Sequence, residues 1–391
     1  MKNMAQTYIW SEPGWPSFRF DAERLKHALS DARLEQGKVM GMFQAIGFDS
    51  EADVAREIWT EEAVATAAIE GEKLDMAAVR SSVMRRLGIA QDGQARVSRN
   101  ADGLLDVMQD ALDSHRERLD NDRLHRWHSA LFPGGTSGIR RINVGAYRDT
   151  DEPMQIVSGP VGREEVHYEA PPSTAVSHEV SGFLEWWEAT RPDEQRDESV
   201  DGLVRAAISH LWFETIHPFE DGNGRIGRAL IDMALAQDAQ SARRLYTMSR
   251  QLMMVREQYY QKLNEAQRNS LDITAWISFF VHQFIAACVA SQSVIDAAIE
   301  KNKFWLAHAQ HALNERQRKA LRRLLDAGKG GFSGGLSAEK YANLTTTSKA
   351  TATRDLTDLA RGGLLIATGQ GRGTRYWINL PGWTAATSPT A

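Results

Sequence analysis

Cysteine is almost absent from this sequence, with Cys288 the single example in 391 residues. One cysteine excludes an intramolecular disulfide and a metal site built from several thiolates, and it fits a reducing compartment. The first ten residues lack the basic stretch and apolar run of a secretory signal. Apolar stretches such as 277–290 are too short and too interrupted to span a bilayer. We therefore expect a soluble, cytoplasmic protein with no membrane contact.

Charge is unevenly distributed along the chain. The net charge is −5, yet residues 311–391 hold 12 Lys and Arg against 5 Asp and Glu. A basic segment on an acidic body predicts two functions in one chain, and nucleic acid is a candidate partner for the basic part. A solvated basic face is the alternative explanation.

The spacing of apolar residues predicts a mainly α protein. Between residues 21 and 87 they recur three and four positions apart, with few helix breakers. Glycine and proline cluster at 134–174 around the β-prone pieces 155–157 and 166–168, which predicts a β-hairpin inserted among helices. Further helical patterns cover 104–112, 124–131, 174–190, 200–216, 225–235, 249–267 and 273–301.

The C-terminal segment, 311–385, has a different rhythm. Three short helical patterns precede two strand-like runs that flank the glycine-rich piece 369–373. This order is typical of a small α+β winged helix-turn-helix domain, a common DNA-reading unit. A protein–protein or dimer-packing module is the alternative. The basic residues that would meet a groove or its phosphates are Lys349, Arg354, Arg372 and Arg375.

Residues 217–228 read His-Pro-Phe-Glu-Asp-Gly-Asn-Gly-Arg-Ile-Gly-Arg. Proline disfavours helix at the residue before it, so His217 is expected where a helix ends. The glycines at 222 and 224 permit backbone angles in which successive N–H groups point into one concavity. A new helix is expected to start at 224–225, and a helix N-terminus favours an anion.

The charged residues of this segment suit a phosphate-bearing ligand. Arg225 and Arg228 lie on one face of the first helical turn, where guanidinium groups can bind phosphate oxygens. Asp221 stands beside this anion site, where a carboxylate usually indicates Mg²⁺ shared with phosphate oxygens. His217 can act as a neutral base near pH 7. Each feature alone has an ordinary structural explanation, but their clustering favours a catalytic site.

This segment resembles the defining motif of the Fic family, His-Pro-Phe-x-(Asp/Glu)-Gly-Asn-Gly-Arg-x-x-Arg, at every fixed position. The resemblance covers about residues 77–301. It implies an all-helical catalytic core, which we place at 77–305, with a β-hairpin flap at about 145–170. Enzymes of this family mostly transfer AMP from ATP to a Ser, Thr or Tyr hydroxyl. The resemblance therefore implies ATP as substrate, Mg²⁺ as cofactor and a target protein as partner.

The same resemblance implies a role for each motif residue. His217 would deprotonate the target hydroxyl, which attacks the α-phosphate in line and expels pyrophosphate. Asp221 would hold Mg²⁺ on the α- and β-phosphates. The remaining ATP-binding residues would be Gly222, Asn223 and Gly224 in the anion hole, and Arg225 and Arg228 on the β- and γ-phosphates.

Two further regions resemble parts of the family's site. The flap residues Met154, Ile156 and Val157 would lay a target segment beside the site by strand pairing. Tyr259 and Gln267 resemble adenine-side positions, where a tyrosine can pack on the base. Buried helix positions are the alternative for these two residues.

The segment 66–71, Thr-Ala-Ala-Ile-Glu-Gly, resembles the family's inhibitory motif, (Ser/Thr)-x-x-x-Glu-(Gly/Asn). Glu70 would therefore be an inhibitory residue paired with Arg228. We place it in an N-terminal helical regulatory domain, residues 1–76. The aromatic start of this domain, around Trp10 and Trp15, is expected to be an extended segment packed on its neighbour.

These observations predict an autoinhibited protein adenylyltransferase that modifies a target protein and itself. One alternative is a related enzyme on the same site, which removes AMP or transfers another phosphate-containing group. A second alternative is a transcriptional regulator that binds nucleotide without turnover. The sequence leaves open the target, the type of hydroxyl, DNA binding and the oligomeric state.

Overall fold

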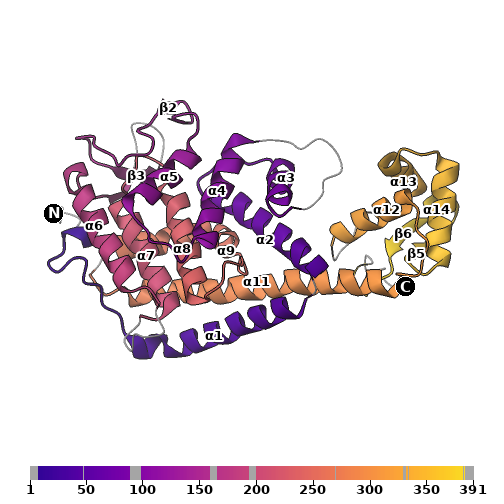
Figure 1. Cartoon of the computed structure of the whole chain (residues 1–391), viewed down its shortest axis with the longest axis horizontal. Coiled ribbons are helices and arrows are strands. Elements are labelled where there is room, and N and C mark those ends of the chain that lie inside the picture. The colour runs from indigo at the N-terminus through magenta and orange to yellow at the C-terminus, as the bar shows by residue number, and fades with distance from the viewer. Residues whose placement is uncertain are drawn as a thin grey trace. The chain divides into compact units, whose positions relative to one another are not determined.

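The computed structural model describes residues 8–46, 48–88, 98–158, 165–192, 200–268, 270–328, 332, 334–381 and 383. It divides into two compact units, Met1–Gln292 and Ser293–Ala391, and both are mainly helical as predicted (Figure 1). The boundaries predicted for three domains stay predictions. Residues 159–164 of the predicted flap lie outside the described part of the chain.

The first unit is built from helices and two small hairpins. Its helices are η1 (Ile9–Ser11), α1 (Ala22–Ala45), α2 (Phe48–Ile69), α3 (Met76–Arg86), α4 (Arg99–Asp113), α5 (Asn121–Leu131), α6 (Ser173–Ala189), α7 (Gly202–Ile216), α8 (Asn223–Asp238), α9 (Met248–Met254), α10 (Arg256–Arg268) and the start of α11 (Thr274–Ala307). Its strands pair antiparallel as β1 (Thr136–Ser137) with β2 (Arg140–Arg141), and β3 (Gln155–Ser158) with β4 (Glu165–Glu169).

Helix α7 forms the centre of this unit. All of its residues from Gly202 to Ile216 are buried, and a helix that is apolar on every side belongs inside a protein. Helix α8 lies beside it (Figure 1), and the two helices carry the predicted catalytic segment between them. The buried pair of helices therefore provides a rigid base for that segment.

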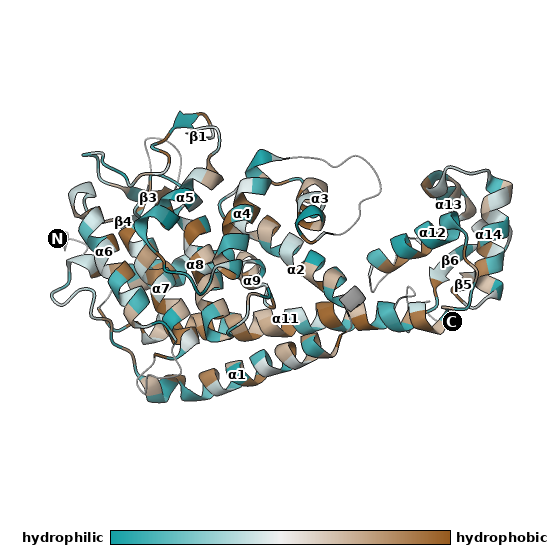
Figure 2. Ribbon diagram, in the orientation of Figure 1, coloured by the Kyte–Doolittle hydropathy of each residue, from teal (hydrophilic) through white to brown (hydrophobic). Residues whose placement is uncertain are grey.

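Helix α11 is longer and more continuously apolar than the sequence analysis allowed. By length and composition it is the one described helix that could cross a membrane, and brown hydrophobic residues recur along it in Figure 2. Several of its large apolar side chains, including Trp276, Phe280 and Phe284, are nonetheless almost fully buried within the first unit. This burial is typical of a core helix.

The N-terminal segment packs against the helical core, as its aromatic residues predicted. The Nε1 of Trp10 donates to the carbonyl of Glu169 (2.8 Å). The Trp15 and Phe18 rings lie 6.1 and 5.6 Å from the ring of Trp212 on α7. The single helix predicted over 249–267 is interrupted, because the β-branched Val255 leaves helical geometry at φ −113°.

The second unit contains α12 (Glu315–Asp326), α13 (Ala338–Thr345) and α14 (Lys349–Arg361), followed by β5 (Leu365–Thr368), η2 (Gly371–Gly373) and β6 (Arg375–Ile378). Strands β5 and β6 pair antiparallel, and Leu336 forms a β-bridge with Tyr376. Asn314 and Gln317 form a capping box at the start of α12. Buried apolar side chains, such as Leu321, Leu356 and Ile378, join the helices to the hairpin in one core.

Candidate active site

The predicted helix end at His217 is present in the structure. Helix α7 stops at Ile216, and His217 takes the left-handed conformation, with φ 49° and ψ 59°. Its N–H still donates to the carbonyl of Phe213 (2.9 Å). Histidine tolerates this conformation better than most residues, and Pro218 prevents continuation of the helix. The side chain of His217 is 14% exposed and lines a cavity.

Two side chains hold the end of α7 in place. Arg148 donates from Nε to the carbonyl of His217 (2.8 Å) and from Nη2 to that of Ile216 (3.2 Å). The hydroxyl of Tyr168 donates to the carbonyl of Thr215 (2.6 Å). These carbonyls have no partner within the helix, and a cation suits their partial negative charge. Arg148 therefore holds the backbone at the end of α7, directly before the predicted catalytic segment.

The loop between the two helices is closed by its own residues. Gly222 has φ 83°, and a Cβ added there would lie 2.9 Å from the ring of Phe132, so the turn requires glycine. The amide of Asn223 accepts from Phe219 N–H (2.9 Å) and donates to the Phe219 carbonyl (2.8 Å). The side chain of Asn223 thus fixes the loop. Only the backbone of this residue is available to the anion hole that we predicted.

Helix α8 offers its N-terminal N–H groups to a ligand. It begins after Gly222, and within the described residues no side chain caps it. The carboxylate of Asp221 lies beside this start and is 38% exposed. It accepts hydrogen bonds from the hydroxyl of Ser137 and from the N–H of Gly222 (2.5 Å). An uncapped helix start beside a partly exposed carboxylate suits an anion accompanied by a metal ion.

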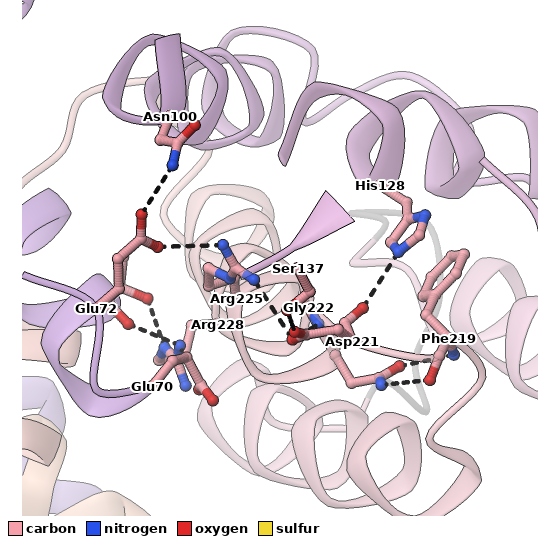
Figure 3. A network of polar contacts seen from close by, with 12 residues as sticks. Glu70, Glu72, Asn100, His128, Ser137, Phe219, Asp221, Gly222, Arg225 and Arg228 are labelled. Atoms are coloured by element: carbon pink, nitrogen blue, oxygen red, sulfur yellow. Dashed lines mark hydrogen bonds and ion pairs between the residues drawn. The ribbon is translucent and has the colours of Figure 1, made fainter. Parts of the chain in front are cut away.

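Both motif arginines are paired with acidic residues from the end of α2 (Figure 3). Arg228 Nη2 lies 2.8 Å from Glu70 Oε1, and Arg225 Nη1 lies 3.3 Å from Glu72 Oε2. The second terminal nitrogen of Arg225, Nη2, lies 3.5 Å from Asp221 Oδ1. Burial opposes ionisation of Arg228, but nearby Glu70 raises the pKa of its guanidinium above the ordinary value. In this structure the two arginines that the sequence predicts to bind phosphate are therefore paired with carboxylates.

The local geometry at residue 70 explains why a glycine follows the glutamate. The N–H of Glu72 donates to the Ala67 carbonyl (3.0 Å) and that of Gly71 to the Ala68 carbonyl (3.0 Å). With Gly71 at φ 79°, these bonds form a Schellman motif that ends α2 at Glu70. Arg228 also contacts Thr66, through Nε to Oγ1 (2.5 Å) and Nη2 to the carbonyl (2.9 Å). The three fixed positions of the predicted inhibitory motif therefore each have a structural role: Thr66 and Glu70 contact Arg228, and Gly71 ends the helix.

A cavity of about 630 Å³ opens beside these groups. The sequence-predicted residues that line it are Glu70, Ile156, Val157, His217, Gly224, Tyr259 and Gln267. Met154 is outside this lining and precedes β3, where its carbonyl accepts from Ala170 N–H (2.9 Å). Tyr259 is 1% exposed and its hydroxyl contacts His210 Nε2 (2.7 Å). Tyr260, 37% exposed in the same wall, presents more ring surface to a ligand than Tyr259.

Burial perturbs the titration of the groups around the base. It lowers the pKa of His217 to about 4, with a further contribution from Arg148. It also lowers the pKa of His128 to about 4; His128 accepts from Gly145 N–H (2.9 Å) and contacts the Asp221 carbonyl (3.2 Å). Both imidazoles are therefore neutral near pH 7. A neutral His217 can accept a proton.

Comparison with known proteins identifies the core of this unit. Residues 118–235 match the model of the Fic/DOC family, and this range includes the segment 217–228. The chain carries a Fic/DOC domain. Ahead of the Fic domain, residues 8–89 match a domain of unknown function, DUF4172.

Individual relatives are distant. A probable protein adenylyltransferase of Aquifex aeolicus is 26% identical over 111 residues, which are 28% of this chain and 30% of that relative. A Fic family protein from Desulfovibrio desulfuricans has 20% identity and a TM-score of 0.50, over 90% of this chain and 95% of its own. A Fic-domain signalling protein from Bacteroides thetaiotaomicron has 17% identity and a TM-score of 0.48, over 68% and 96%. The Desulfovibrio structure supports the predicted Fic-type helical fold.

Several residues of the site were not found by the sequence analysis. Glu72 follows Glu70 by two positions. The Schellman turn between α2 and Glu72 directs both carboxylates to arginines of α8. Ser137 and His128 reach Asp221 from distant parts of the chain. Glu214 lies one helical turn before His217, and that spacing was a signal that a helix places both side chains on one face.

Proposed function

We propose that this chain is an autoinhibited protein adenylyltransferase. It transfers AMP from ATP to a Ser, Thr or Tyr hydroxyl of a target protein, and of itself, with release of pyrophosphate. The observation that carries the proposal is that a neutral, partly buried histidine, an uncapped helix start and two arginines lie close together in one segment. The family of residues 118–235 and the name of the Aquifex relative support it.

The chemistry divides among the residues of the α7–α8 segment. His217 takes the proton of the target hydroxyl while the hydroxyl oxygen forms a bond to the α-phosphorus. The bond from that phosphorus to the bridging β-oxygen breaks, and pyrophosphate leaves with the electron pair. The N–H groups at the start of α8 stabilise negative charge, and Arg225 and Arg228 hold the β- and γ-phosphates. Positioning and charge stabilisation provide most of such catalysis.

Asp221 is the residue that would hold Mg²⁺. No cluster of three or more acidic, histidine or cysteine side chains suited to a metal occurs in the described ranges. A single carboxylate beside a phosphate site is the protein share that Mg²⁺ commonly takes, the remainder being phosphate oxygens and water. When bound, the ion would neutralise phosphate charge.

Glu70 acts as the inhibitor of this site. Its Oε1 lies 2.8 Å from Arg228, and a Cβ added at Gly224 would meet the same oxygen at 2.2 Å. The carboxylate therefore stands at the start of α8, where phosphate would bind. It occupies donors of Arg228 and repels a triphosphate, so ATP cannot adopt a productive pose.

The chemistry is tested with ATP labelled on the α- or the γ-phosphate, with and without Mg²⁺, using the Glu70→Gly variant. We expect Mg²⁺-dependent label on protein from the α position alone. Label from the γ position would instead identify a kinase. Absence of label from either position, with added lysate as a source of targets, would contradict a transferase.

Autoinhibition is tested by comparing wild type, Glu70→Gly, Arg228→Ala and the double variant at one ATP concentration. Glu70→Gly should raise AMP incorporation at least tenfold, whereas Arg228→Ala and the double variant should stay low because the phosphate clamp is missing. Glu72→Gln is the matched comparison, since it removes the neighbouring carboxylate and leaves the Glu70–Arg228 pair intact. Its increase should be smaller. Equal activity of Glu70→Gly and wild type would make Glu70 an ordinary helix-end residue.

We further propose that the second unit binds DNA through α14. Its helices and hairpin follow the order of a winged helix, with α14 as the recognition helix. Lys349, Thr353, Arg354 and Thr357 are all exposed on α14, while Ala352, Leu356 and Leu359 face the core. This face is polar, basic and free of acidic residues up to Asp358, as contact with phosphates requires.

Gel shifts at several salt concentrations test the DNA proposal. The double change Lys349→Gln with Arg354→Gln should weaken binding about tenfold and reduce the slope of log affinity against log salt by about 2. Arg318→Gln with Arg322→Gln removes the same charge from exposed positions on α12 and should leave both values nearly unchanged. An equal loss in the two double variants would indicate a general basic surface.

A further inference from the structure

Glu214 lies in the floor of the site and has no part in the mechanism above. It is on the last turn of α7, three residues before His217, and is 4% exposed. A Cβ added at Gly227 of α8 would lie 2.5 Å from Glu214 Oε1. The glycine at this motif position therefore leaves room for a carboxylate between α7 and α8. Burial of a carboxylate costs free energy. A functional role for Glu214 would account for this cost.

The carboxylate of Glu214 is directed at the base. Its Oε2 is 3.8 Å from Nδ1 of His217. Neither that Nδ1 nor Glu214 Oε1 forms a hydrogen bond with a side chain among the residues that the structure describes. Catalytic hydrogen bonds are often long in structures without substrate and shorten in the complex. An acceptor beside Nδ1 is the arrangement that leaves Nε2 free to take a proton.

Charged and titratable groups from α2, α8, α10 and two loops face this pair. Burial raises the pKa of Glu214 to about 8, the charge of Glu70 at the end of α2 adds to the rise, and Arg228 of α8 opposes it. Tyr259 and Tyr260 of α10 also face Glu214. Arg148 lowers the pKa of His217, whereas a contact with the backbone of Glu214 and the charges of Glu70 and Asp221 raise it. With Glu70 in place, Glu214 therefore holds a proton near pH 7. Withdrawal of Glu70 removes the negative charge that adds to this rise, and so favours the ionised carboxylate of Glu214.

We propose that Glu214 is a positioning residue for His217. Its carboxylate accepts the Nδ1 proton of His217, holds the tautomer whose Nε2 is free, and stabilises the imidazolium that forms when the target hydroxyl loses its proton. Glu70 then restrains the enzyme twice, because it blocks Arg228 and keeps Glu214 protonated. This inference rests on the proposed role of His217 as the base.

The experiment uses full-length protein in the Glu70→Gly background, with Glu214→Gln, Glu214→Asp and the parent. Turnover with ATP gives kcat and its pH profile, and binding of a non-cleavable α,β-bridged ATP analogue gives Kd. We expect Glu214→Gln to lower kcat about tenfold to 100-fold, with Kd changed less than twofold. The rise of kcat with pH that follows ionisation of Glu214 should disappear. Glu214→Asp should restore part of the rate.

A second measurement needs no turnover, so it separates this inference from the proposed function. Nitrogen-15 NMR of labelled histidine reports the tautomer and pKa of His217, assigned by comparison with His217→Ala. Glu214→Gln should lower that pKa and increase the Nε2–H form. Glu62→Gln is the control, since Glu62 is equally buried but faces Arg244 (3.8 Å). An unchanged His217 signal in Glu214→Gln would overturn the proposal, because it would show that the backbone alone positions the base. A raised Kd with unchanged kcat would show that Glu214 acts on nucleotide binding through Arg228 and does not position His217.

Discussion

At the scale of single residues, the site contains two arginines that are paired with carboxylates close to them in space. Arg228 contacts Glu70, and Arg225 lies between Glu72 and Asp221 (Figure 3). The guanidinium of Arg228 is 3% exposed, and a buried arginine without a counter-charge is costly. Some anion must therefore accompany it in every state. In this structure that anion is the carboxylate of Glu70, and in the function that we propose the γ-phosphate of ATP would replace it.

We expect His217→Ala to abolish AMP transfer in the Glu70→Gly background while ATP binding is retained. The base acts on the target hydroxyl and makes no proposed contact with nucleotide, so its loss belongs to the chemical step. Labelled-ATP incorporation and analogue binding measure the two effects separately. Transfer at the parental rate would remove His217 from the mechanism.

The change Asp221→Ala should lower activity by weakening Mg²⁺, and excess Mg²⁺ should restore part of it. Activity measured across a Mg²⁺ series reports the concentration at half-maximal rate, which should rise at least tenfold. Ser137→Ala is a useful comparison, since it removes only the hydroxyl that contacts Asp221 and should shift the series less. An unchanged Mg²⁺ series in Asp221→Ala would place the metal elsewhere.

At the scale of elements, the end of α2 is the part to which we assign inhibition of the site. Its last turn supplies the Thr66 carbonyl to Arg228, and the Ile69 carbonyl accepts from Arg256 Nε (2.8 Å) and Tyr260 (3.3 Å). Cations at a helix C-terminus complement its partial negative charge. Polar contacts thus attach the helix end to α8 and α10. A phosphate group could replace such polar contacts more readily than it could replace apolar packing.

Gly71→Ala should raise basal AMP incorporation by a fewfold. Alanine is strained by about 1 kcal/mol at a positive φ, and a Cβ at residue 71 (φ 79°) would meet nothing within 4 Å. The effect would therefore act through the Schellman turn that places Glu70. Gly88→Ala is the matched control, with φ 68° and equally open space at the end of α3. Both variants should lose similar thermal stability, and only Gly71→Ala should gain activity. Equal activity in the two would dissociate the turn from the inhibition.

At the scale of the whole molecule, the chain combines two units with separate cores. Arg33 on α1 joins the N-terminal helices to the Fic domain, through Asp201 (2.8 Å) and Asp238 (2.5 Å). Residues 8–89 and 118–235 therefore share one compact unit although they match different families. The second unit has its own apolar core around Leu356. The regulation that we propose for α2 and the catalysis that we propose for α7–α8 both require this arrangement.

Calorimetry should consequently resolve two unfolding transitions. Arg33→Ala leaves two carboxylates without their cation and should cost about 1–2 kcal/mol, since Arg33 is one-third exposed. Leu356→Ala empties a fully buried position and should cost about 2–5 kcal/mol. Each variant should lower the Tm of its own unit alone. A single transition that shifts with both changes would mean that the two units unfold together.

Local sequence patterns determined the chemistry of the site and most of its elements. The spacing within residues 217–228 predicts the helix end at His217, the glycine turn and the new helix, because these features depend on neighbouring residues. The β-prone pieces 155–157 and 166–168, with glycine and proline around them, likewise predict the β3–β4 hairpin. The end of α2 at Glu70-Gly71 was not predicted, because residues 21–87 contain few helix breakers. Each of the predicted features depends on backbone preferences within a few residues.

Only the tertiary structure decided which of these parts meet. Glu72 and Arg225, and likewise Thr66 and Arg228, come together because α2 packs on α8 across more than 150 positions of sequence. The inward turn of the Asn223 amide, the support of α7 by Arg148 and the place of Glu214 beside His217 also depend on packing. Such contacts follow from the burial of whole helix faces, which no short pattern encodes.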